Sequence, residues 1–226
     1  MTGFKILVSG DYACFTRPEM KVERVSYDVI TPSAVRGILE AIHWKPAITW
    51  VVARIHVLKP IRFTSFRRNE VGSKIPMGSV SSARNSGDIS KLGLHVDQDR
   101  QQRAMLCLSR VEYGIEARFQ MTRHAGPEDT AAKHAEMFRR RAERGQCFHQ
   151  PYLGVREFPA DVRLVEEFPE TELPPDDQGR DLGWMLDDFD YPDDGKDALP
   201  SPYFYRARMR DGVIDVAECR NQGGAA

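Results

Sequence analysis

Residues 31–58 constrain the fold most, because a capped helix pattern runs almost directly into an apolar strand pattern. Thr31 suits the N-cap position and Pro32 the first helical position. Apolar residues then recur at i, i+3, i+4 and i+7, which predicts one buried stripe made of Val35, Ile38, Leu39 and Ile42. Pro46 disfavours a helical conformation in the residue before it, so the helix should end by Lys45. The segment AITWVVARIHVL (47–58) is rich in β-branched and aromatic residues, which predicts a central strand.

Other segments extend this pattern in both directions. We expect a strand at 4–9, a strand at 104–121, a helix at 128–145 that stops at Gly145, and strand structure within 152–168. In the second of these strands, alternation predicts a buried face made of Val111, Tyr113, Ile115, Ala117 and Phe119. The order strand, helix, strand, strand, helix, strand predicts an α+β protein whose residues 1–168 form a ferredoxin-like (RRM-like) βαββαβ domain.

The rest of the chain carries weaker signals. Residues 62–104 are polar and contain Gly and Ser, which predicts a long loop. Residues 169–226 are expected to form a small acidic antiparallel β domain. In its last part, Arg210-Asp211-Gly212 separates the β-prone runs 203–209 and 213–219 and predicts a terminal hairpin. Five acids between positions 187 and 194 lack the spacing of a cation-binding loop and are interpreted as a solvated loop: Asp187, Asp188, Asp190, Asp193 and Asp194.

Charge is distributed unevenly along the 226 residues. Residues 1–150 contain 24 Lys and Arg against 15 Asp and Glu, whereas the remainder contains 8 against 18. This asymmetry indicates either a basic surface for a polyanion or attraction between the two parts. No apolar run approaches 18 residues and no leader pattern is present, so we expect a cytoplasmic protein. The four cysteines form no C-x-x-C pair, so we expect reduced thiols and no zinc knuckle.

Basic and aromatic residues alternate in the segment RFTSFRRNEVGSK (62–74). Arginines engage phosphates and rings stack on splayed bases, which is typical of proteins that hold single-stranded RNA. A solvated basic loop is the alternative. The candidate RNA-binding residues, here and in two other basic segments, are Arg17, Lys21, Lys45, Phe66, Arg67 and Arg68.

Two histidines stand out by their positions. His43 falls at the end of the first predicted helix, and His134 follows Lys133 in the first turns of the second. In a ferredoxin-like fold both helices pack on the same side of the sheet, so these groups could surround one anion. Alternatively, His43 caps a carbonyl and His134 packs within its helix face.

Several motifs together resemble the CRISPR-associated family-five proteins of type I-C, the Dvulg subtype, which are repeat-associated mysterious proteins (RAMPs). The motifs are GDYACFTRPE (10–19), YDVITPSAVRGILEAIHWKPAITWVV (27–52), HVLKPIRF (56–63), KHAEMFRRR (133–141), PYLGVREF (151–158) and WMLDDFDYPDD (184–194). The resemblance implies catalytic roles for Lys133 and His134. The third catalytic position, often tyrosine in this family, falls on His43.

The resemblance also implies an activity and partners. Members of this subtype cut precursor CRISPR RNA at the base of each repeat hairpin without a metal or other cofactor. They then keep the 5′ handle within the interference complex, beside its backbone and large subunits. Such cleavage needs a base for the 2′-hydroxyl, an acid for the departing 5′-oxygen and positive charge at the phosphorane. Two histidines and a lysine can supply these, while the alternatives are a non-catalytic scaffold that binds the RNA handle and an acylphosphatase-like hydrolase.

Overall fold

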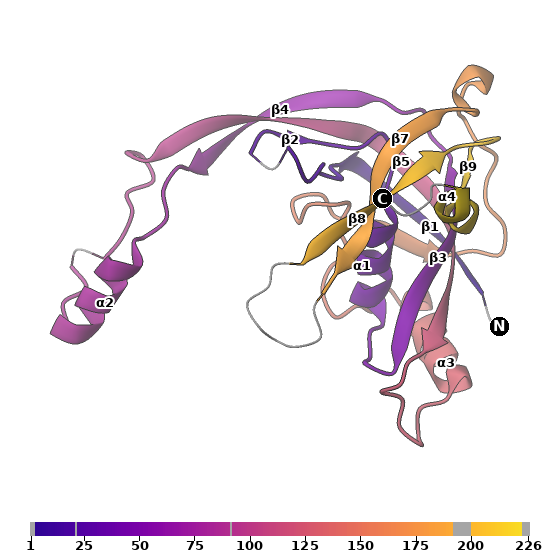
Figure 1. Ribbon diagram of the computed structural model, residues 1–226, viewed down its shortest axis with the longest axis horizontal. Helices are drawn as coiled ribbons and strands as arrows, with labels where there is room; N and C mark the ends of the chain where they lie inside the picture. Colours follow the sequence, from indigo (N-terminus) through magenta and orange to yellow (C-terminus); the bar gives the residue numbers. More distant parts are fainter. Residues whose placement is uncertain (1–2, 21, 91, 192–199, 223–226) are drawn as a thin grey trace. The chain divides into compact units, whose positions relative to one another are not determined.

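The computed structural model describes residues 3–20, 22–90, 92–191 and 200–222 (Figure 1). Contacts divide the chain into two units, which are treated separately below. The first combines Met1–Thr64 with Leu106–Ala226, and the second is Ser65–Met105. Among the described residues, no helix has the length and apolar character needed to cross a membrane.

A large antiparallel sheet forms the centre of the first unit. Its strands are β1 (Phe4–Ala13), β3 (Ile48–Val57), β5 (Arg100–Met121, which enters this unit at Leu106), β6 (Asp161–Leu164) and β9 (Val213–Asp215). They lie in the order β6-β1-β5-β3-β9, and the short β2 (Arg24–Val25) pairs with β5. Each neighbouring pair along the order is antiparallel. The predicted mixed α and β character is confirmed.

Two helices pack against this sheet, α1 (Pro32–Ile42) on β3 and α3 (Ala131–Glu143) on β6, and they also contact each other. Thr31 caps α1 as predicted, because its side chain accepts a hydrogen bond from the Ala34 N–H. The four residues of the predicted stripe on α1 are all buried. Gly145 follows α3 with a φ of 62°, which confirms it as the stop signal.

Strand β3 keeps its apolar face inward despite an irregularity. Ile48, Trp50 and Val52 are buried, and the alternation resumes at Ile55 because the register with β5 shifts between Val52 and Arg54. A bulge of this kind returns the apolar set to the same face. The predicted buried face of β5 is also confirmed, with Phe119 partly buried and the other four residues buried.

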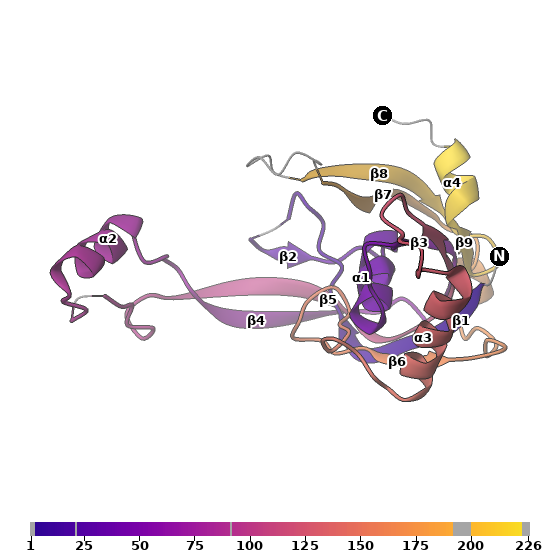
Figure 2. The same ribbon diagram turned by 90° about the horizontal axis from the view of Figure 1, so that it is seen from below.

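The C-terminal part pairs differently from the prediction. Asp211 and Gly212 do form a tight turn with positive φ values of 50° and 74°, closed by a bridge between Arg210 and Val213. However, β8 (Ser201–Arg208) pairs with β7 (Asp181–Asp190), and β9 pairs with β3. Val216–Gln222 forms the helix α4 where a strand was expected, so the hairpin does not extend beyond its turn. A single 3-10 turn, Pro175–Asp177, precedes β7. Figure 2 shows α1 between the large sheet and the β7–β8 pair.

Two acids of β7 bind arginine side chains. The interpretation as a solvated loop was wrong for these two. Asp188 accepts hydrogen bonds from Arg36 of α1 at 2.6 and 2.7 Å. Asp187, which is only 2% exposed, accepts two from Arg220 of α4. The pair of Arg36 and Asp188 joins the basic and acidic parts of the chain, so attraction between these parts accounts for some of the charge asymmetry. Positions 193 and 194 lie outside the described residues.

The second unit replaces the loop predicted at 62–104. It contains most of β4 (Phe63–Val71), α2 (Met77–Ser86) and the beginning of β5, and β4 pairs with β5 (Figure 1). Among the described residues, β4 has β5 as its strand neighbour. Exposed and half-buried residues alternate along β4, so neither face is deeply buried and polar residues can occupy most of the strand. A hydropathy pattern that depends on a buried face therefore could not reveal it.

Two further expectations can be compared with the structure. The segment 152–168 contributes only the four residues of β6, since 151–160 is irregular apart from a bridge between Tyr152 and Pro159. No disulfide joins the four cysteines, all of which lie in the described ranges, with Cys147 exposed and the other three buried.

Candidate active site

His43 lies where α1 stops. It occupies the C-cap with an extended backbone (φ −150°, ψ 110°), and its N–H still donates to the Leu39 carbonyl. The Trp50 indole N–H donates to the His43 carbonyl at 2.9 Å, so strand β3 holds the end of the helix. These bonds fix the direction in which the imidazole leaves the backbone.

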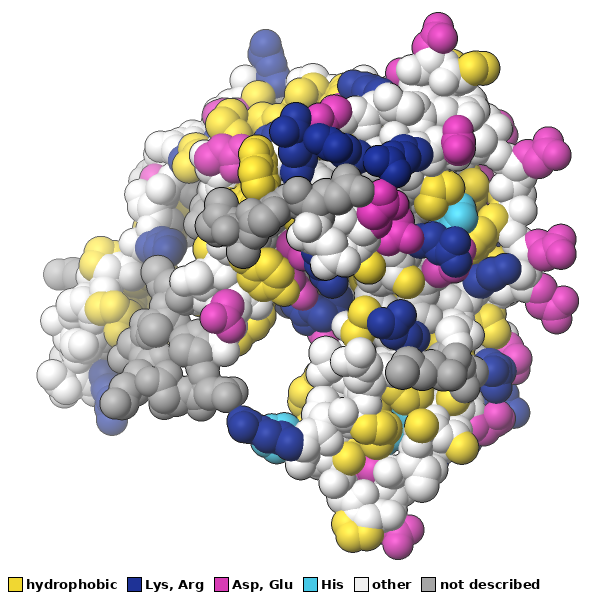
Figure 3. All heavy atoms as spheres, turned by 45° about the vertical axis from the view of Figure 1, so that its right-hand side comes forward, with side chains coloured by type: hydrophobic (Ala, Val, Ile, Leu, Met, Phe, Trp, Pro, Cys, Tyr) yellow, Lys and Arg dark blue, Asp and Glu magenta, His cyan; other side chains and the backbone are white. Residues whose placement is uncertain are grey.

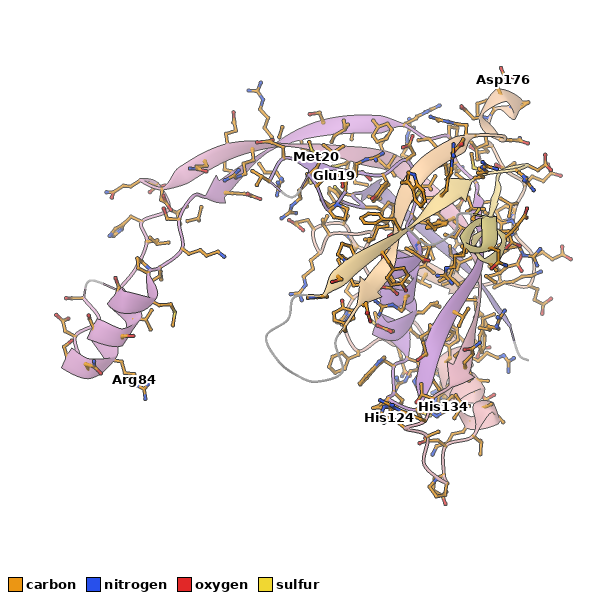
Figure 4. The ribbon with its side chains drawn as sticks, in the orientation of Figure 1. Glu19, Met20, Arg84, His124, His134 and Asp176 are labelled. Atoms are coloured by element: carbon orange, nitrogen blue, oxygen red, sulfur yellow. The ribbon has the colours of Figure 1, made fainter. Side chains whose placement is uncertain are left out.

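His134 lies in the first turns of α3, as labelled in Figure 4. Thr130 caps this helix by accepting a hydrogen bond from the Lys133 N–H at 3.2 Å. The His134 ring rests edge-on against Phe119 of β5, with ring centroids 6.2 Å apart. The helix and the sheet together therefore orient the ring.

The structure brings the two histidines into direct contact. His43 Nε2 lies 3.1 Å from His134 Nδ1, and the residues are 0% and 1% exposed. The expected approach of the two helix ends is thus found. The histidines bind each other, however, instead of leaving space between them for an anion. The carbonyls at the end of α1 have other donors: Arg141 donates to the Ile42 carbonyl and Trp50 to the His43 carbonyl. The His43 side chain therefore does not cap either of them.

The hydrogen bonds around this pair have one consistent direction. Arg141 Nη1 lies 3.3 Å from His43 Nδ1, and a guanidinium can only donate. His43 therefore carries its proton on Nε2 and donates to His134 Nδ1. His134 then carries its proton on Nε2, which lies 3.2 Å from Asp129 Oδ1. We call Arg141, His43, His134 and Asp129 the histidine chain.

Burial and charge keep His43 neutral. Burial is the main cause that lowers its pKa to about 4, and the neighbouring groups Arg141, His134 and Lys45 act in the same direction. At the other end of the chain, the Gly126 N–H bond to the Asp129 carboxylate is the main cause that lowers the pKa of Asp129, with His134 and Lys133 adding to it. Asp129 is partly exposed, so the histidine chain runs from the interior to the surface.

Lys133 is exposed and separate from the histidine contact. Its ammonium donates to the Glu128 carbonyl at 3.1 Å. This bond places a cation on the loop that also carries Asp129, which is the surface end of the histidine chain. Lys133 is therefore available to a ligand that approaches His134 from solvent.

The predicted RNA-binding residues in the first unit have different surroundings. Arg17 lies over the Tyr27 ring at 4.5 Å and pairs with Asp28, so its charge is partly compensated. Lys45 is exposed beside His43. Lys21 lies outside the described residues. On the face drawn in Figure 3, several Lys and Arg side chains lie next to one another near the top, with Asp and Glu side chains beside them.

The three candidates on β4 do not form one surface. Alternation along the strand places Phe66 and Arg68 on the half-buried face and Arg67 on the exposed face. Arg68 also forms an ion pair with Glu70. The three side chains were predicted as one RNA-binding set. In a strand, however, adjacent residues point to opposite faces, so Arg67 lies on the other face from Phe66 and Arg68.

Sequence reasoning missed Arg141 and Asp129. Arg141 is seven residues after His134, two turns along the same helix face, so this spacing could have suggested that both reach His43. Asp129 offered no such signal, because it precedes the helix and its position depends on the turn that begins at Gly126. Within the described ranges, no three His, Cys, Asp or Glu side chains are grouped as ligands for a metal ion.

This geometry defines a class of protein: an α+β fold with two imidazoles in contact where the ends of two helices meet. The family described as "CRISPR-associated protein (Cas_Cas5)", in its Cas5d form, matches residues 3–217. The chain belongs to this family. It is 55% identical over 215 residues to a protein of Mannheimia succiniciproducens named "CRISPR pre-crRNA endoribonuclease Cas5d", covering 94% of this chain and 93% of that one. A protein of the same name from Thermus thermophilus is 41% identical over 230 residues, covering 96% and 92%.

Solved structures share the fold. One titled "Crystal Structure of CRISPR-associated Protein" is 26% identical with a TM-score of 0.67, and the match covers 97% of this chain and 95% of that one. A chain from a "CRISPR RNA-guided surveillance complex" is 15% identical with a TM-score of 0.52, covering 92% and 90%. At that identity the second match shows similarity of fold alone.

Proposed function

We propose that the protein is a metal-independent endoribonuclease that cleaves precursor CRISPR RNA within its repeats. The names of the two curated relatives support the substrate and the reaction class. The observation that carries the proposal is the 3.1 Å contact between His43 Nε2 and His134 Nδ1, because it joins the ends of two helices at one polar site in the core.

The reaction starts from the RNA 2′-hydroxyl, which attacks the adjacent phosphorus while the bond to the 5′-oxygen breaks. The products are a 2′,3′-cyclic phosphate and a 5′-hydroxyl. Because Nε2 of His134 carries the proton, this ring donates it to the departing 5′-oxygen once RNA displaces Asp129, and water takes up the proton of the 2′-hydroxyl. His43, neutral at its lowered pKa, donates to His134 Nδ1 and keeps the tautomer and orientation of that ring.

Lys133 stabilises the phosphorane. Its ammonium is exposed and lies one residue from His134 in the sequence, so it can leave the Glu128 carbonyl for a phosphate oxygen. A lysine suits this role because its charge is compact and its stem flexible. Lys45 and Arg17 are proposed to bind the RNA backbone, and Arg17 would have to leave Asp28 to do so.

The proposal includes the architecture and the partners. The strand order β6-β1-β5-β3, with α1 and α3 as connections, supports a ferredoxin-like domain at residues 1–168. The β7–β8 pair supports a small β domain at 169–226. After cleavage the protein retains the 5′ handle beside the backbone and large subunits of a type I-C interference complex.

Cleavage of a CRISPR repeat RNA in EDTA tests this function. We expect cleavage with a 2′,3′-cyclic phosphate on one product and a 5′-hydroxyl on the other. A matched RNA with a single 2′-deoxy substitution at the scissile nucleotide should bind and stay intact. Cleavage that requires added Mg²⁺, or equal cleavage of the deoxy substrate, would refute the mechanism.

The rival function is that of a scaffold that binds the RNA handle without cutting it. The burial of both histidines favours this alternative, because neither ring reaches solvent without movement of Asp129. Tight, salt-sensitive binding of the repeat with no cleavage in the same assay would support the scaffold.

A further inference from the structure

An aromatic side chain lies almost wholly in solvent beside the end of α1. Phe148 is 90% exposed, more than any other large hydrophobic residue in the described part of the chain. Single exposed apolar residues need no explanation in general, but a phenylalanine with almost its whole ring in solvent forgoes the burial that usually fixes it.

The loop that carries Phe148 is held in place by hydrogen bonds. The Gln146 N–H donates to the Arg141 carbonyl at 2.8 Å, and the Phe148 N–H donates to the Ala41 carbonyl of α1 at 2.7 Å. The Gln150 side chain donates to the Ala160 carbonyl at 3.1 Å. The exposed ring is therefore presented from a fixed backbone that is bonded to α1 two residues before His43.

Phe148 begins a short series of rings. The His149 ring lies 6.1 Å from it at a steep angle, and the Tyr152 ring stacks on His149 at 6.2 Å. At the α1 terminus, Trp44 directly follows His43 and is 55% exposed. Exposed aromatic rings are thus present on the segment that follows His43 and on the loop that is hydrogen-bonded to Ala41.

The surrounding charge favours RNA over an apolar protein partner. Residues 139–148 contain four arginines and one glutamate, and Lys45 adjoins Trp44. Among the described residues no carboxylate pairs with Arg140, Arg144 or Lys45. Exposed rings among uncompensated cations are the arrangement by which proteins hold unpaired nucleotides, because bases stack on rings while cations contact phosphates.

We propose that Phe148, supported by His149 and Tyr152, is a stacking site for one unpaired base of the RNA next to the cleaved phosphate. The site fixes the position of the strand relative to His134, so Phe148 is a positioning residue. This inference rests on the proposed function, since it assumes that RNA reaches the histidine chain.

The test compares Phe148→Ala, Phe148→Leu and Phe148→Trp with the wild type. Binding is measured with the 2′-deoxy repeat RNA, cleavage with the natural repeat, and stacking by 2-aminopurine placed at unpaired positions around the cleavage site. Phe204→Ala, which removes an exposed ring from β8, is the matched control. Because the Phe148 ring lies in solvent, its variants should fold normally.

We expect Phe148→Ala and Phe148→Leu to weaken RNA binding by about 5- to 100-fold and to remove 2-aminopurine quenching at one position. Phe148→Trp should restore both, and Phe204→Ala should match the wild type.

If the wild type cuts RNA but Phe148→Ala binds and cuts equally well, the stacking site is refuted while the function stands. Unchanged RNA binding with lost assembly into the protein complex would also refute it and assign the ring to a protein contact. Absence of RNA binding and cleavage in the wild type would instead refute the function.

Discussion

Burial is the main cause of the neutral state of His43, and the neighbouring Arg141 reinforces it. Arg141 donates to Nδ1, so protonating that nitrogen would place two cations in contact. The side chain is therefore a fixed donor toward His134. This makes His43 poorly suited to supply a proton near neutral pH.

The lowered pKa of His43 predicts how stability depends on pH. The unfolded chain binds a proton on this ring below its ordinary pKa of about 6.5, whereas the folded protein does so only near 4. The free energy of unfolding should therefore fall as the pH drops from 6.5 towards 4. Between pH 7 and pH 5 this group should contribute a loss of about 2 kcal/mol.

Urea unfolding of the wild type and of His43→Gln at these two pH values measures this contribution. Glutamine can still donate to His134 but does not titrate. The wild type should lose about 2 kcal/mol more than the variant on acidification. Equal losses in both proteins would show that His43 is not held neutral by the fold.

At the level of residues, the sequence predicted part of the site. The approach of His43 and His134 followed from two helices packed on one side of a sheet. Which of the four arginines near the end of α3 faces inward depended on the crossing of α1 and α3, which local patterns do not determine. Asp129 was also hidden, because a loop carboxylate is placed by turn geometry and not by periodicity.

Among the elements, β7 illustrates how charge can mislead. Its acids suggested a solvated loop, but Asp187 and Asp188 bind arginines on α4 and α1. The sequence showed that acids and arginines were present. It could not show that they form ion pairs between elements that pack together. The strand β4 and the helix α4 were also missed. Neither contains a long run of periodically spaced apolar residues, which is the pattern that would have predicted it.

The ion pair between Arg220 and Asp187 should matter for stability. Removing Arg220 leaves a buried carboxylate without its partner, so Arg220→Ala should lower the free energy of unfolding by about 3 kcal/mol. Arg220→Ala combined with Asp187→Leu should recover most of the loss. The control is Arg210→Ala, which breaks the exposed pair with Glu218 and should cost less than about 1 kcal/mol. Equal denaturant midpoints for Arg220→Ala and Arg210→Ala would contradict this view.

At the scale of the whole molecule, the described residues of the second unit contribute nothing to the main hydrophobic core. The core cluster draws its members from the first unit alone, including the aromatic group Phe4, Trp50 and Phe138. Ring centroids in this group lie 4.7 to 5.8 Å apart. The free energy of unfolding should therefore depend mainly on the first unit, which also contains the histidine chain.

Replacing Ser65–Met105 with a short glycine-containing turn tests this division. The thermal midpoint should stay within about 4 °C of the wild type, which corresponds to ~1 kcal/mol for a chain of this size. Circular dichroism would follow the transition. Loss of cooperative unfolding would show that the second unit is needed for the fold of the first.

The central claim is that the histidine chain is the active site of an RNA-cleaving enzyme. The most direct measurement is the single-turnover rate of repeat cleavage in EDTA for the wild type, His134→Ala and Lys133→Ala, with RNA affinity measured in parallel. We predict that each variant keeps its affinity within about threefold and loses at least about 100-fold in rate. Cleavage by both variants at the wild-type rate would contradict the account.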